Sequence, residues 1–256
     1  MPSSADPSRP PRGATLLLGL ALGGFFDGIL LHQVLQWHHL LSKVEAVREL
    51  RWQLLADGLF HLLMYALALA ALARLWRRRA HLGAGGPLLA AALAGFAGWH
   101  VLDALLSHWI LGIHRIRVGV PDPLFWDLLW LGLFGGLPLM AACWLHRRPS
   151  GGSGAGAATA LGVVAVAAGA ASLLPLSRPP AGSVVVFAPG IPPAHAYQAL
   201  ARLDARVRWV DPAGSVWSVE WSGTPGAWQL LREGALLAGG SPLAFGCIAA
   251  AGPSPR

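Results

Sequence analysis

The segment ATLLLGLALGGFFDGILLHQVLQWHHLL, residues 14–41, sets the class of the whole protein. It is apolar over more than the roughly 20 helical residues that cross ~30 Å of hydrocarbon. No small-residue cleavage site follows it, so we interpret it as a retained membrane span and not as a signal peptide. Four further stretches meet the same criterion, at about 52–74, 87–113, 123–145 and 156–176.

The composition agrees with a membrane protein and excludes a cytosolic enzyme. Hydrophobic residues make up 55% of the 256 residues, charged residues only 12%, and the mean hydropathy is +0.53. The net charge of +7 is first interpreted as loop charge that sets the membrane topology, because no basic patch is interleaved with aromatic residues. We therefore expect the lipid bilayer as a partner and no nucleic acid.

The pattern predicts four regions. Residues 1–13 form a polar, proline-containing tail, and residues 14–146 form an all-α transmembrane bundle of four helices. Residues 147–177 hold a linker and a fifth transmembrane helix, and residues 178–256 form a C-terminal α+β domain. Lys and Arg near the span ends number eight on the side of the N-terminus and six on the other. This bias favours a cytoplasmic N-terminus and an extracytoplasmic C-terminal domain.

The C-terminal domain is expected to be ferredoxin-like. Its apolar runs alternate in the order β-α-β-β-α-β, which is typical of that sandwich. The predicted elements are a strand at 183–189, a helix at 192–203, two strands within 205–222, a helix at 226–237 and a last strand at 243–250. We find no catalytic motif in this region, and we make no assignment of an enzymatic activity or of catalytic residues to the chain.

An internal repeat relates the first and third spans. Both contain the pattern D-x4-H-x5-H, as Asp27, His32 and His38 in the first and as Asp103, His108 and His114 in the third. Each copy precedes a span with an early aspartate, Asp57 in one and Asp127 in the other. We interpret the four spans as two duplicated helical hairpins related by a pseudo-twofold axis along the membrane normal.

The ionisable residues of the spans gather in the outer half of the predicted bundle. At ~1.5 Å per residue, His32, His61 and His108 lie about 9 to 12 Å below the outer surface. In an ideal α-helix, however, Asp27 stands about 140° away from His32 around the axis. Either both faces of the first span are buried in protein, or the helix bends there, which Gly28 would permit.

Imidazoles at one depth on facing helices, supported by carboxylates, are typical of a metal site. We expect His32, His61 and His108 to form a middle tier, with Asp57, Asp103 and Asp27 as ligands or as their hydrogen-bond partners. His38, His39 and His114 are expected to form an outer entry site. A ligand set of nitrogen and oxygen without cysteine suits copper, zinc or iron, and the sequence leaves these three open.

Three alternatives stand beside this metal site. A b-type haem uses two histidines from facing helices at equal depth, and His32 with His108 meets that condition. A proton or ion relay uses the same polar ladder, although the ladder stops halfway across the predicted bundle. The third alternative is a structural assembly subunit without a cofactor, in which the polar side chains only join helices.

The motifs GFFDGILLHQVLQWHHLLS, DGLFH and VLDALLSHWILGIHRIR, followed by FWDLLWL, resemble a family of predicted four-span bacterial membrane proteins of unknown function. The resemblance covers about residues 14–145. It implies a multi-pass protein of the bacterial inner membrane, with members near oxidase-assembly and copper-handling systems. The chain departs from the family pattern at His100, where asparagine is usual, and at Arg115, where a second histidine is usual.

Overall fold

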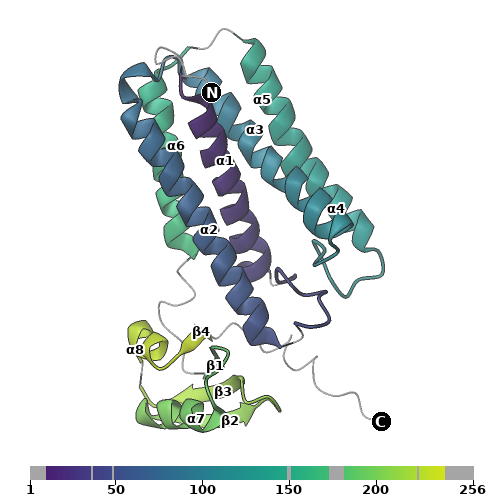
Figure 1. Ribbon diagram of the computed structural model, residues 1–256, viewed down its shortest axis with the longest axis vertical. Helices are drawn as coiled ribbons and strands as arrows, with labels where there is room; N and C mark the ends of the chain where they lie inside the picture. Colours follow the sequence, from purple (N-terminus) through teal and green to yellow (C-terminus); the bar gives the residue numbers. More distant parts are fainter. Residues whose placement is uncertain are drawn as a thin grey trace, which may run out of the picture. The chain divides into compact units, whose positions relative to one another are not determined.

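The computed structural model describes residues 10–35, 37–47, 49–148, 151–172, 182–223 and 225–239. The chain divides into two compact units, one with the long helices and one with a small antiparallel sheet (Figure 1). Most of the described chain is helical, as the composition predicts.

Among the described residues, five helices are long and apolar enough to cross a membrane, which agrees with the predicted number of spans. They run over Arg12–Val34, Arg51–Arg77, Gly85–Ile110, Pro123–Arg147 and Gly154–Ser172. Three of these spans combine an α-helix with a π-helical segment: α1 (Arg12–Asp27) with η1 (Gly28–Val34), α3 (Gly85–Asp103) with η3 (Ala104–Ile110), and α4 (Pro123–Trp130) with η4 (Leu131–Gly136) and α5 (Leu137–Arg147). The other two are single helices, α2 (Leu50–Arg77) and α6 (Gly154–Ser172). A short 3-10 turn, η2 (Arg79–His81), follows α2.

The first span ends earlier than its apolar sequence predicts. The helix stops at Val34 and not near Leu41, because the chain unwinds through the wider bonds Leu35 N–H to Leu30 O (2.8 Å) and Trp37 N–H to Leu31 O (2.9 Å). The third span unwinds in the same way after Ile110. The residues after each helix are therefore free to fold back over the helix ends.

Helices α1 and α3 approach each other closely because small residues meet at their crossing. A methyl group at Gly19 would overlap the carbonyl oxygen of Ala92, and one at Gly95 would overlap the carbonyl oxygen of Leu16. The two contacts are related by the repeat, since Gly95 stands 76 positions after Gly19 and Ala92 stands 76 positions after Leu16. In Figure 1, α1 lies between α2 and α3. The buried Phe25 side chain of α1 contacts the ring of Tyr65 in α2, with 5.0 Å between ring centroids.

The fifth helix, α6, packs against α1, α2 and α3. Its last turn is joined to the first hairpin by polar contacts. The Tyr65 hydroxyl donates to the Gly169 carbonyl, and Gln33 Nε2 donates to the Ser172 carbonyl at 3.0 Å. The start of α6 lies beside the start of α3, where Gly154 N–H donates to the Gly83 carbonyl at 3.0 Å. The helix therefore runs in the same direction as α1 and α3.

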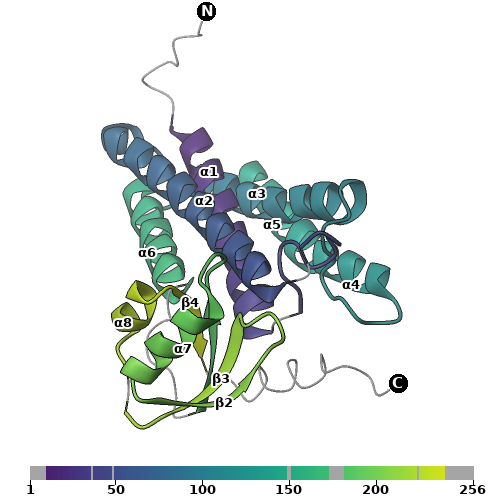
Figure 2. The same ribbon diagram turned by 60° about the horizontal axis from the view of Figure 1, so that its bottom comes forward.

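The second unit contains a four-stranded antiparallel sheet with the strand order β2-β3-β1-β4. Its elements are β1 (Gly182–Phe187), α7 (Pro193–Arg202), β2 (Ala205–Val210), β3 (Val216–Trp221), α8 (Ala227–Arg232) and β4 (Ala235–Gly239). Side chains of both helices share one core with one face of the sheet, where Phe187, Leu200 and Trp217 are buried. Figure 2 shows α7 crossing the sheet.

One predicted boundary in this unit is wrong. The helix expected at 226–237 ends at Arg232, and the fourth strand begins at Ala235. Gly234 adopts a φ of 87°, a conformation that glycine tolerates and that stops the helix. The strand expected at 243–250 lies outside the described residues.

Candidate metal centre

A π-helical turn brings the two polar residues of the first span onto one face. Asp27 is the last residue of α1, and His32 lies five positions later within η1. In a π-helix the hydrogen bonds join residues five apart, so residues at i and i+5 stand about one turn above each other. Asp103 and His108 stand in the same relation at the junction of α3 and η3. The sequence offered burial of both helix faces or a bend near Gly28, whereas the structure aligns the two residues through a π-turn.

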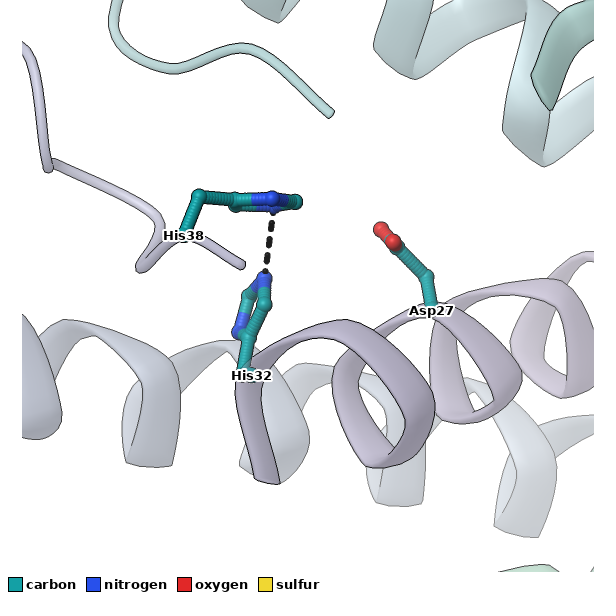
Figure 3. Close-up of side chains that lie close together, drawn as sticks. All are labelled: Asp27, His32 and His38. Atoms are coloured by element: carbon teal, nitrogen blue, oxygen red, sulfur yellow. Dashed lines mark hydrogen bonds between the residues drawn. The ribbon is translucent and has the colours of Figure 1, made fainter. Parts of the chain in front are cut away.

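The first triad consists of Asp27, His32 and His38, whose potential ligand atoms lie within 4.8 Å of one another. His32 Nε2 faces His38 Nε2 at 3.1 Å. Figure 3 shows the two rings edge to face, with the carboxylate of Asp27 directed toward the space beside them. Asp27 Oδ2 accepts from Trp99 Nε1 at 3.3 Å, whereas its buried Oδ1 has no hydrogen-bond partner in the described chain.

The second triad consists of Asp103, His108 and His114 and meets the same 4.8 Å criterion. His108 Nε2 lies 3.0 Å from Asp103 Oδ2, and His114 Nε2 lies 3.4 Å from Asp103 Oδ1. Although close, neither Nε2 atom has a hydrogen bond among the described residues. The donor atoms of this triad are thus close to one another without being aligned into hydrogen bonds.

The two triads are joined through His38 and His114. Their rings stack with 4.5 Å between centroids and 7° between planes. Each ring is held by a backbone carbonyl of the opposite repeat: His38 Nδ1 lies 2.9 Å from Ile116 O, and His114 Nδ1 lies 3.0 Å from Leu40 O. A carbonyl can only accept, so both Nδ1 atoms carry the proton and leave the Nε2 lone pairs available as ligands.

Two further aspartates, Asp57 and Asp127, lie next to the Nδ1 atoms of His32 and His108. Asp57 Oδ1 lies 3.1 Å from His32 Nδ1, and Asp127 Oδ1 lies 3.2 Å from His108 Nδ1. Each of these carboxylates also accepts a backbone N–H of the loop that folds back, from Leu40 at 2.8 Å and from Ile116 at 3.1 Å. Carboxylates in this position fix the ring orientation of metal-binding histidines and raise their basicity.

The two halves differ in the residue that holds the second oxygen of each supporting carboxylate. His39 Nδ1 lies 2.7 Å from Asp57 Oδ2, whereas the Arg115 guanidinium donates to Asp127 Oδ2 at 2.6 Å. In the second repeat, Arg115 therefore adds a permanent positive charge next to the carboxylate that supports His108. In the first repeat, the imidazole of His39 takes that place beside the carboxylate that supports His32.

The cluster is buried and rich in negative charge. Asp27, Asp57, Asp103 and Asp127 are each 6% exposed or less. Among the described residues, Arg115 is the only Lys or Arg in an ion pair with any of them. Asp27 and Asp103 are near enough to repel each other. Since an uncompensated buried charge is strongly unfavourable, the cluster needs further cations, as protons or as metal ions.

His38 itself lies in the loop after the first span, and its environment keeps it neutral. Burial, followed by the neighbouring His32 and His114, holds the pKa of His38 well below its ordinary value of 6.5. The neutral ring, with its proton on Nδ1, presents a lone pair on Nε2 to His32. Two imidazole nitrogens that face each other at 3.1 Å attract each other when a hydrogen atom or a metal ion lies between them.

The structure groups the predicted site residues differently from the tiers expected from sequence. His32 and His108 join His38, His114, Asp27 and Asp103, while Asp57 and His39 lie behind His32. His61 belongs to neither triad: its Nδ1 contacts its own helix at Asp57 O, at 3.1 Å. His100 also lies apart, where its Nδ1 accepts from Trp130 Nε1 at 3.2 Å.

Sequence reasoning did not include Asp127 or Arg115 in the predicted site. The repeat carried a signal for both, because Asp127 occupies the position of Asp57 and Arg115 that of His39. No sequence signal identifies the carbonyl groups of Leu40 and Ile116 as ring acceptors, since any residue supplies a carbonyl.

A family model described as "Predicted membrane protein (DUF2243)" matches residues 14–149, more than half of the chain. The chain belongs to this family. Neither the curated proteins nor the solved structures include a match. The family region extends from α1 to the end of α5 and contains both triads with their two supporting aspartates. Helix α6 and the strands of the sheet lie outside the family region.

Proposed function

We propose that the protein binds metal through the two triads, Asp27 with His32 and His38, and Asp103 with His108 and His114. Copper, zinc and iron all suit this set of four imidazoles and two carboxylates. The observation that carries the proposal is the 3.1 Å approach of His32 Nε2 to His38 Nε2, with an oxygen atom 2.9–3.1 Å from the Nδ1 atom of each ring. Ligand bonds of ~2.0–2.1 Å at a tetrahedral angle put two nitrogens roughly 3.3 Å apart, close to this spacing.

A proton shared by His32 and His38 is the competing explanation, and it corresponds to the proton-relay function. The same 3.1 Å spacing suits a hydrogen bond between two imidazoles. The unpartnered Asp27 Oδ1 and the misaligned Nε2 atoms of His108 and His114 favour a metal ion, because a single shared proton satisfies none of them. Haem is disfavoured, since His38 and the carboxylate of Asp103 already cover the Nε2 atoms of His32 and His108 at 3.0–3.1 Å.

The wider role that we propose is accessory to a membrane redox or metal-delivery system, such as an oxidase-assembly complex, in the bacterial inner membrane. The charge bias supports a cytoplasmic N-terminus. With that orientation, the metal centre lies toward the outer side, at the end of the bundle where α1 and α3 stop. Helix α6 ends near Gln33 at the same end, which supports an extracytoplasmic sheet unit. The strand order of that unit supports a ferredoxin-like fold.

Elemental analysis of the detergent-purified full chain tests the proposal. We expect bound copper, zinc or iron in the wild type and none in the double variant His32→Asn/His108→Asn. The matched control is His100→Asn, which makes the same change at a buried histidine outside the triads and is expected to retain the metal. A wild-type protein free of metal after expression and after incubation with each of the three ions would contradict the proposal and favour the proton relay.

A further inference from the structure

Six donors converge in this centre, three from each repeat. The ligand atoms fall into two groups that each fit within 4.8 Å, and no such group combines the two repeats in the described chain. One octahedral ion with bonds of ~2.1 Å would need all six donors within about 4.2 Å of one another. The six donors are therefore too widely spread for one ion, whereas each triad by itself gathers its three ligand atoms within 4.8 Å.

The charges also suit more than one cation. With neutral imidazoles, the four buried aspartates and Arg115 leave three net negative charges. One divalent ion leaves the cluster negative by one charge, and a second makes it positive by one. Asp27 and Asp103, which belong to different triads, repel each other, and a cation beside each carboxylate relieves this repulsion most fully.

The triads are also mechanically coupled. His38 of the first triad is held by the Ile116 carbonyl of the second repeat, and His114 of the second triad by the Leu40 carbonyl of the first. The stacked rings of His38 and His114, 4.5 Å apart, then bring the two ion positions next to each other. Two-metal sites in proteins have ions roughly 3.5–4 Å apart.

We infer that the protein holds a dinuclear metal centre, with one ion in each triad and His38 and His114 in contact between them. The inference rests on the proposed metal-binding function and specifies it. The two ions are inequivalent, because Arg115 adds a permanent positive charge behind His108 where His39 stands behind His32.

Metal counting distinguishes this inference from the simpler proposal. After removal of metal by a chelator, the full chain is dialysed against Zn²⁺ and the bound ion is measured. We expect two ions per chain in the wild type and in His100→Asn, one in His32→Asn or His108→Asn, and none in the double variant. One ion per chain in the wild type, lost in either single variant, would overturn the dinuclear centre and leave metal binding intact. No ion at all would overturn both.

A second measurement tests whether the two ions are adjacent. The wild type loaded with Cu²⁺ is examined by electron paramagnetic resonance during titration. Two adjacent ions are expected to broaden or abolish the mononuclear signal as the second equivalent binds, whereas His108→Asn keeps an uncoupled signal at saturation. An uncoupled signal from two equivalents in the wild type would show two separate sites and would overturn the shared centre.

Discussion

The imidazole rings of His38 and His114 stack at 4.5 Å, with 7° between their planes, although 76 residues separate them in the sequence. Each is the last histidine of its own D-x4-H-x5-H segment, and each binds a carbonyl of the other segment. The two repeats therefore build one site at their interface, and neither repeat forms its triad independently of the other.

The supporting carboxylates give the first prediction. Asp127→Asn removes the charge that orients His108 and should lower the affinity for metal by roughly 10- to 100-fold. Asp122→Asn is the matched control, because Asp122 is exposed and caps α4, a role that asparagine also fills. Competition with a chelator of known affinity measures both. Equal affinities in the two variants would contradict the role assigned to Asp127.

Arg115→His should make the second half resemble the first. Replacing a permanent cation on Asp127 with a neutral ring reduces repulsion of a bound ion, and we expect about tenfold tighter binding of the second ion, equivalent to about 1.4 kcal/mol. Arg117→His is the control, since Arg117 lies over the Trp37 and Trp126 rings at 4.9 and 4.8 Å. Isothermal titration with Zn²⁺ measures both, and unchanged or weaker binding in Arg115→His would refute the prediction.

Close packing of α1 on α3 gives a prediction about stability. Gly95→Ala places a methyl group against the Leu16 carbonyl and should destabilise the bundle by about 1–3 kcal/mol. Gly98→Ala, on the same helix, meets nothing within 4 Å and should be neutral or stabilising by about 0.5–1 kcal/mol. Thermal unfolding in detergent compares the two, and a Gly95→Ala protein as stable as Gly98→Ala would argue against this crossing.

Removal of metal should lower the melting temperature of the wild type. A ligand present at 100 times its Kd stabilises the native state by about 2.7 kcal/mol, and for a chain of this size that corresponds to several degrees. The double variant His32→Asn/His108→Asn should melt at the same temperature with and without chelator. A chelator effect of equal size in both proteins would show that the stabilising ion binds elsewhere.

The sequence predicted the number of spans because the length of an apolar run is a local property. The helix Arg51–Arg77, for example, lies close to the expected 52–74. It also predicted which side chains are unusual, since Asp27 and His32 stand out in any apolar span. It did not predict the π-turn between them. In an ideal α-helix the two residues stand about 140° apart, and they align only where the backbone hydrogen bonds join residues five apart.

The identities of the donors were thus determined by the sequence alone, through their polarity in an apolar environment and their repeated spacing. Their partners were decided by the tertiary structure. His61 joins neither triad, although a similar depth was expected for it, while His38 returns to His32 from a loop that was expected to be helical. Hydrophobicity fixes how deep a residue lies, whereas the unwinding after Val34 and Ile110 and the close crossing of α1 and α3 fix which residues meet.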